Sequence, residues 1–214
     1  MNDLEFAALL VSRVCHDLVS PVGAVVNGLE VLEEERDAAL RADALRLVAS
    51  SAALAAARLQ FARIAFGTAG STGAELDLME VGRMVGGFLS GGKIQLEWDA
   101  APVNWPKDWA KLLMNCVVIA ADTLPRGGNL SVKTTDNTAG PGFLITGIGQ
   151  SARLNEDVGR VLCGETALPS DGRSVQSYLT YRLAKLLNTE LVLHAGEGTV
   201  TLAAGKLIST ADIR

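Results

Sequence analysis

Apolar residues recur at steps of three and four positions through the first third of the chain, a spacing that predicts long amphipathic helices. In the first segment they are Val14, Leu18, Val22 (or Pro21), Val25, Leu29 and Leu32. Asn2 and Glu5 have the spacing of a capping box, so we expect the first helix to run from Asn2 to about Glu35. Its apolar stripe is a seam for packing against other helices.

A second segment, residues 38–66, keeps the same rhythm and is rich in alanine and leucine. Gly67 is a suitable C-terminal stop, and a charged turn at residues 33–37 joins the two helices. We therefore expect an antiparallel helical hairpin over residues 1–67. One hairpin cannot bury broad apolar faces on both helices, whereas two hairpins packed as a four-helix bundle can, so we predict a homodimer.

Beyond a glycine-rich linker at residues 67–73, the pattern changes to short alternating strands and shorter helices. Strands are expected at residues 94–98, 130–134, 142–146, 191–194 and 199–203. Helices are expected at residues 76–89, 106–121, 155–162 and 175–187, with Pro106 in a first turn. This order predicts an α+β fold over residues 75–214, with helices on one face of a sheet.

Composition excludes several classes of protein. The chain has 214 residues, 49% of them hydrophobic, and a net charge of -5 without any basic block, so we expect no nucleic-acid partner. The uncharged stretch between Asp17 and Glu30 is too short to cross a membrane, and no signal peptide is recognisable, which favours the cytoplasm. Three scattered cysteines suggest neither disulfides nor a zinc site, and we expect Cys15 to be buried.

A polar stripe runs along the first helix beside the apolar seam and carries candidate chemistry. Its members are His16, Ser20, Gly23, Asn27 and Glu30. Because His16 lies off the seam, we expect its ring to reach solvent. Pro21 lacks an N–H and crowds the carbonyl group of Asp17, so the turn after His16 should be bent or loosened. A histidine, an adjacent acid, a hydroxyl one turn later and a proline together predict a functional site.

The segment from His16 to Pro21, HDLVSP, resembles the phosphoacceptor box of histidine kinases. A dimerisation hairpin, a linker and a mixed domain is also the layout of a kinase core. Residues 112–128 resemble the kinase asparagine box and the turn after it, with Asn115 at the position of the first asparagine. The resemblance implies that the hairpin is followed by a histidine-kinase ATPase-like α/β sandwich domain.

Several nucleotide-binding positions depart from the kinase pattern. Ile119 stands at the position of the magnesium-binding asparagine, and Asp122 at that of the usual lysine. The sequence before Gly147-Ile148-Gly149 has no aspartate for the adenine, and residues 174–176 stand where a glycine-rich turn would approach the phosphates. Isoleucine offers no oxygen ligand for Mg²⁺, so we predict no ATP binding and no intrinsic cofactor.

A kinase-like chain without an ATP site resembles the ChpT-type histidine phosphotransferases of alphaproteobacteria. The segments that carry this resemblance are residues 13–17, 20–21, 27–30 and 61–67. The family implies a homodimeric phosphorelay shuttle that takes a phosphoryl group from the receiver domain of a hybrid histidine kinase. It then passes the group to receiver domains of response regulators. The Mg²⁺ needed for transfer is expected from the receiver.

Within this reading His16 is the nucleophile, because neutral imidazole offers a lone pair near neutral pH. Asp17 either accepts a hydrogen bond from the other ring nitrogen or acts through phosphoryl oxygens and water. Ser20 can donate to a phosphoryl oxygen. Two roles are open to Arg13: contact with the same phosphoryl group, or an ion pair with Asp17 four residues on.

Other residues are expected to support the partner or the hairpin. Asn27 and Glu30 either help to form the receiver-docking face or cap local contacts. Val19 and Val22 either contact the partner or pack in the core. Arg63 either pairs with the first helix or is solvated. Two competing functions remain, an ATP-dependent sensor histidine kinase core and a non-catalytic dimeric scaffold that binds receivers.

Overall fold

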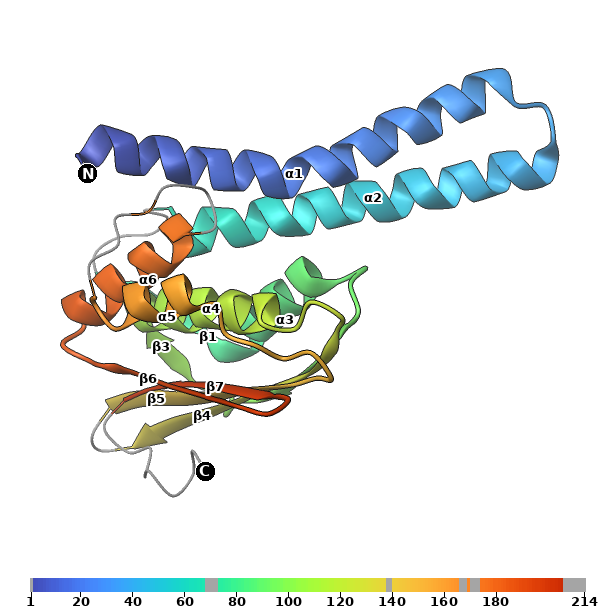
Figure 1. Ribbon diagram of the computed structural model, residues 1–214. Coiled ribbons are helices and arrows are strands. Elements are labelled where there is room, and N and C mark those ends of the chain that lie inside the picture. The colour runs from blue at the N-terminus through green and yellow to red at the C-terminus, as the bar shows by residue number, and fades with distance from the viewer. Residues whose placement is uncertain (1, 68–72, 138–139, 166–168, 170–173, 206–214) are drawn as a thin grey trace.

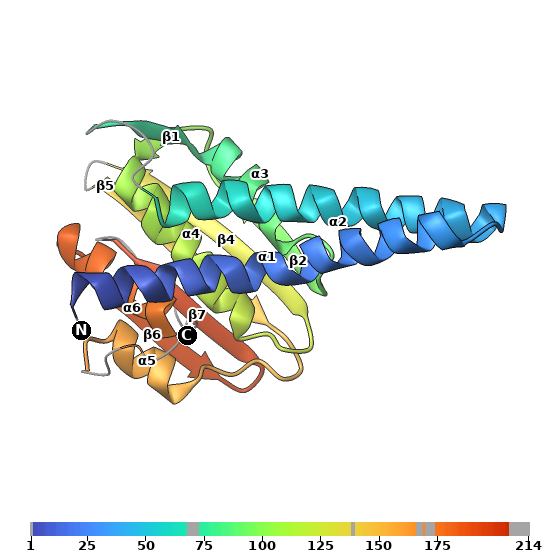
Figure 2. The same cartoon turned by 90° about the horizontal axis from the view of Figure 1, so that it is seen from above.

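The structure of the protein, a computed structural model, describes residues 2–67, 73–137, 140–165, 169 and 174–205. The helices α1 (Asp3–Glu34) and α2 (Ala38–Ala65) form an antiparallel hairpin, and the rest of the chain forms a C-terminal α/β part. Figure 1 shows three layers: the hairpin, then a layer of helices, then a sheet. Seen from above, the tip of the hairpin extends beyond the α/β part (Figure 2).

Both hairpin helices begin at side-chain caps. Asn2 and Glu5 form the expected capping box, and Asp37 accepts hydrogen bonds from two backbone N–H groups at the start of α2. The buried stripe of α1 passes through Pro21 and Gly28, whereas Val22 is 48% exposed. A side chain at Gly28 would meet Val48 at 2.6 Å, so glycine permits the close approach of the two helices here.

The α/β part is built on a mixed five-stranded sheet with strand order β2-β4-β5-β7-β6, in which only the β2–β4 pair is parallel. Its strands are β2 (Ile94–Asp99), β4 (Gly128–Asn137), β5 (Gly140–Ile148), β6 (Leu191–Gly196) and β7 (Thr199–Ala204). The helices are α3 (Leu78–Leu89), α4 (Lys107–Asp122), α5 (Glu156–Leu162) and α6 (Ser174–Leu186). They cover one face of the sheet, which confirms the predicted α+β arrangement (Figure 1).

Two short strands were not predicted. The strands β1 (Glu75–Asp77) and β3 (Asn104–Pro106) pair with each other, with Leu76 opposite the fully buried Trp105. Three residues are too few to establish an alternating pattern in the sequence. As a result Pro106 is the N-cap of α4 rather than a first-turn residue. Most of the expected linker, residues 68–72, lies outside the described residues.

The end of α2 is part of the hydrophobic core of the α/β part. Phe61 and Ala65 are fully buried there with residues of α3 and α4. The ring centroid of Phe61 lies 4.3 Å from that of Phe88 on α3. Near the same open end of the hairpin, Phe6 of α1 makes an edge contact with Tyr178 of α6. The hairpin therefore rests on the helix layer at several points rather than through the linker alone.

The exposure of the cysteines and the apolar composition of α1 differ from expectation. Cys15 and Cys163 are exposed, so the expected burial of Cys15 was wrong, whereas burial raises the pKa of the Cys116 thiol. By length and composition alone, α1 could cross a membrane. In the structure the helix packs along α2 and carries an ion pair between Arg13 and Asp17 near its middle.

Candidate functional site

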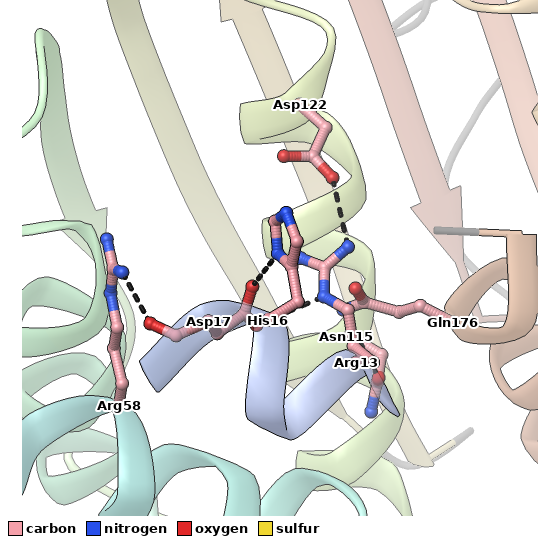
Figure 3. Close-up of polar contacts among 7 residues, drawn as sticks. All are labelled: Arg13, His16, Asp17, Arg58, Asn115, Asp122 and Gln176. Carbon is pink, nitrogen blue, oxygen red and sulfur yellow. Dashed lines mark hydrogen bonds and ion pairs between the residues drawn. The ribbon is translucent and has the colours of Figure 1, made fainter. Parts of the chain in front are cut away.

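The imidazole of His16 projects from the middle of α1 with 68% of its side chain exposed. Its Nδ1 lies 3.2 Å from Oδ1 of Asp17 (Figure 3). A carboxylate can only accept, so in the neutral ring this contact places the proton on Nδ1 and leaves the lone pair on Nε2. The expected orientation of the ring by the adjacent acid is therefore present in the structure, although neighbouring helix positions point in different directions.

A chain of charges continues from Asp17 into the α/β part. Arg13 Nε lies 3.0 Å from Oδ2 of Asp17, and Arg13 Nη1 lies 3.8 Å from Oδ2 of Asp122 on α4. Arg13 is only 6% exposed, which favours such pairing over solvation. Of the two roles open to Arg13, the structure shows the ion pair with Asp17. Asp122, at the position of the kinase lysine, gives that arginine a second anionic neighbour.

A cleft of about 590 Å³ lies beside the histidine, between α1 and the helix layer. Its lining comes from four helices: Arg13, His16, Asp17, Val19 and Ser20 of α1, Arg58 of α2, Phe88 of α3 and Asp122 of α4. The structure thus brings together the three predicted catalytic residues and two of the supporting ones. Val19 is 69% exposed at this cleft and is available to a partner, in agreement with one of its two readings.

The remaining supporting residues do not line the cleft. Val22, Asn27 and Glu30 are exposed further along α1, toward the tip of the hairpin. Arg63 is exposed in the last turn of α2, and no ion pair to it occurs among the described residues. Of the two alternatives for Arg63, the structure shows the solvated side chain, and a different arginine of α2, Arg58, contacts α1.

Two cleft residues, Arg58 and Phe88, were not found by sequence reasoning. Arg58 Nη1 donates a hydrogen bond of 2.6 Å to the carbonyl oxygen of Asp17 (Figure 3). The sequence did show that Pro21 leaves this oxygen without its helical donor. It could not show which distant residue supplies one, because the contact joins positions 41 apart.

The positions of the kinase nucleotide site are filled by contacts within the protein. Asn115 is fully buried and donates hydrogen bonds to the carbonyl oxygens of Ala65 (3.2 Å) and Lys111 (2.9 Å). Gln176 of α6 donates to Oδ1 of Asn115 at 3.5 Å. Ile119, 4% exposed, offers no oxygen ligand to a metal. These residues do not fit a magnesium nucleotide.

The same region attaches α2 to α4. Lys111 Nζ donates a hydrogen bond to the carbonyl oxygen of Gly67, just beyond the end of α2. Partial burial, with Lys107 nearby, lowers the pKa of Lys111. Together with the bond from Asn115 to Ala65, this contact satisfies two backbone carbonyl groups at the C-terminal end of the hairpin. Asn115 therefore holds the hairpin to the α/β part.

Among the described residues, no cluster of three or more histidines, cysteines or acids could hold a metal.

Comparisons with known proteins agree with this geometry. The sequence model of a family described as histidine phosphotransferase C-terminal domain matches residues 78–199. The protein phosphotransferase ChpT of Brucella abortus is 39% identical over 205 residues, which covers 95% of this chain and 97% of that protein. A solved structure described as a bacterial phosphotransferase is 38% identical, with a TM-score of 0.85 over 95% of this chain and 97% of that one.

The fold is also shared with a kinase. The histidine kinase domain of a blue-light activated histidine kinase from Erythrobacter litoralis EL346 gives a TM-score of 0.50 at 14% identity, over 86% of this chain and 94% of that chain. This likeness concerns the fold alone. The family match covers more than half of this chain, and the Brucella relative matches it almost from end to end. This chain therefore belongs to the histidine phosphotransferase family.

Proposed function

We propose that this protein carries a phosphoryl group between receiver-domain aspartates of a phosphorelay through a phosphohistidine at His16. The observation that carries the proposal is the exposed imidazole whose Nδ1 is held by Asp17, at the edge of an open cleft. Such a ring presents Nε2 to a partner without help from a cofactor. Family membership supports the phosphotransfer and the geometry supports the choice of residue.

In the first step, Nε2 of His16 attacks the phosphorus of a receiver aspartyl phosphate. An N–P bond forms, the O–P bond breaks, and the aspartate carboxylate leaves. In the second step, the carboxylate of another receiver attacks the phosphohistidine, and neutral imidazole leaves. Phosphoryl transfer depends mainly on positioning and charge stabilisation. Asp17 stabilises the positive ring formed in between, as a triad carboxylate stabilises an imidazolium.

The neighbouring residues have proposed roles that follow from their places. Ser20 lines the cleft one turn from His16 and donates its hydroxyl to a phosphoryl oxygen. Arg13 holds Asp17 in position through their ion pair. The exposed residues Val19, Val22, Asn27, Glu30 and Arg63 form part of the proposed docking surface for a receiver.

We also propose that the protein binds no ATP and needs no cofactor of its own. Asn115 donates to two backbone carbonyl groups, Gln176 donates to Asn115, and Ile119 replaces a metal ligand. The Mg²⁺ for both transfers then comes from the receiver. Neither phosphoryl transfer requires a component from outside the cytoplasm, so we propose a cytoplasmic location.

One assay distinguishes the shuttle from its two alternatives. The protein is mixed in one arm with a phosphorylated receiver and in the other with labelled ATP and Mg²⁺. We expect acid-labile phosphate on the chain in the first arm only, and no melting-temperature shift with ATP. Autophosphorylation or a clear nucleotide-dependent shift would support the kinase. Receiver binding without phosphate on the chain would support the scaffold.

A homodimer is proposed from the uncovered side of the hairpin. Besides Val19 and Val22, nine large apolar residues of α1 and α2 are more than 40% exposed: Leu4, Val11, Val26, Leu29, Val31, Leu40, Leu45, Leu47 and Leu59. A second hairpin covers such faces in a four-helix bundle. Leu40 and Leu47 are seven residues apart and therefore lie on one side of α2.

Size-exclusion chromatography with light scattering should give the dimer mass at micromolar concentration. Leu47→Glu is expected to weaken dimerisation by at least about tenfold, because a charge replaces an apolar contact at a buried interface. Val192→Glu makes the same change at an exposed apolar residue of β6 and should leave the dimer unchanged. A monomer for the unaltered protein would contradict the bundle.

A further inference from the structure

The carbonyl group of Asp17 lacks its ordinary helical partner. In an α-helix this oxygen would accept a hydrogen bond from the N–H of residue 21, but Pro21 has none. The ribbon of α1 changes direction partway along its length in Figure 1, and Pro21 is the only proline in this helix. The turn from Asp17 to Pro21 also contains Ser20, so the peptide groups of this turn orient the candidate catalytic residues.

Arg58 supplies the missing donor from the facing helix. Its Nη1 lies 2.6 Å from the Asp17 oxygen, and its guanidinium carbon lies 5.9 Å from the centre of the Phe88 ring. Phe88 in turn stacks on the buried Phe61. The Arg58 Nε is enclosed and makes no hydrogen bond with the described residues, so packing and this one contact hold the guanidinium.

We propose that Arg58 is a positioning residue that takes the place of the backbone N–H removed by Pro21. By holding the Asp17 carbonyl group, it fixes the turn on which His16, Asp17 and Ser20 are mounted. A hydrogen bond from a charged donor is stronger than a neutral one, which suits it to replace a helical bond. The expected effect on transfer rests on the proposed function. If His16 is the nucleophile, its displacement by about 1 Å lowers the rate of transfer by about 10²-fold.

If Arg58 replaces the N–H that Pro21 lacks, the effect of removing the Arg58 donor should depend on whether residue 21 is proline. A double-mutant cycle measures this dependence. Arg58→Met keeps a long stem and removes the donor, whereas Pro21→Ala restores an N–H four residues after Asp17. Arg58→Met alone is expected to lower kcat for transfer from a phosphorylated receiver by about 10- to 100-fold. Its KM should change less than about twofold. In the Pro21→Ala background the same change should cost less than about threefold.

Two outcomes would overturn the inference. An equal loss in both backgrounds would mean that Arg58 acts on the phosphoryl group or the receiver rather than on the Asp17 carbonyl group. No loss in either background would mean that the contact has no effect on transfer. Arg58→Lys keeps a charged donor and should retain most of the rate. It also provides a folded variant if Arg58→Met unfolds, which circular dichroism would reveal.

A readout without receivers separates this inference from the proposed function. In isotope-labelled protein, the carbonyl ¹³C shift of Asp17 should move in Arg58→Met and return toward its original value when Pro21→Ala is added. That result with no phosphoryl transfer in the unaltered protein would contradict the proposed function but support the positioning role. An unmoved shift in an active protein would contradict the positioning role alone.

Discussion

Replacing His16 by alanine is expected to lower the rate of phosphoryl transfer between receivers by at least about 10³-fold, because no other group at the cleft can form the N–P bond. His16 is the one imidazole among the residues that line the cleft, Arg13 and Arg58 are cations, and the Asp17 carboxylate is paired with Arg13. The fold should be unaffected, since an exposed side chain contributes at most about 0.5 kcal/mol to stability.

The other histidine of the chain gives a matched control. His194 is exposed on β6, away from the cleft, so His194→Ala should transfer at the rate of the unaltered protein. The measurement is phosphoryl flow from one receiver to a second, with the melting temperature and dimer mass of each variant recorded alongside. Unchanged flow in His16→Ala would refute the phosphohistidine and leave the scaffold as the better explanation.

The second large effect concerns the joint between the hairpin and the α/β part. Phe61→Ala is expected to lower the free energy of unfolding by about 3–5 kcal/mol, the usual cost of removing a fully buried phenylalanine. The cavity would open between α2 and Phe88. Because Phe61 belongs to the core of the α/β part, the loss should weaken the hairpin and that part together.

Denaturant unfolding tests this coupling at a fixed protein concentration. Fluorescence reports on Trp98, Trp105 and Trp109, all in the α/β part, while far-ultraviolet circular dichroism is dominated by helices. Both signals should follow one transition, shifted to lower denaturant in Phe61→Ala. Gln60→Ala, a change at the exposed neighbouring position, should shift it little. Two separate transitions in the unaltered protein would show that the hairpin and the α/β part unfold independently.

Periodicity along the chain predicted the long helices, the strand order along the sequence and the exposure of His16. These features depend on local spacing, because residues three or four apart share a helical face whatever surrounds them. The apolar seam was located less accurately. The sequence offered Val22 or Pro21 and also included Leu29, whereas the structure buries Pro21 and Gly28. Tight packing of α1 on α2 selects the small or flat residue, which an apolar pattern does not distinguish from a large one.

Contacts between distant segments could not be predicted in the same way. Arg58 and Phe88 reach the site only because α2 and α3 pack together. The ion pair of Arg13 with Asp122 likewise depends on where α4 lies. The sequence did show two local features behind these contacts. The carbonyl group of Asp17 lacks its helical donor, and Asp122 stands at a position where kinases carry lysine. The sequence left their partners unidentified.

The burial of Phe61 and Ala65 has a consequence for how a signal moves through this protein. A kinase that modifies its own histidine must bring a nucleotide-loaded module to that residue, so its output follows an internal motion. Here the last turns of α2 are embedded in the neighbouring core and hydrogen-bonded to Asn115, and both contacts oppose such a motion. Under the proposed function, throughput would be governed by second-order collisions with separate receiver proteins and would scale with their cellular abundance.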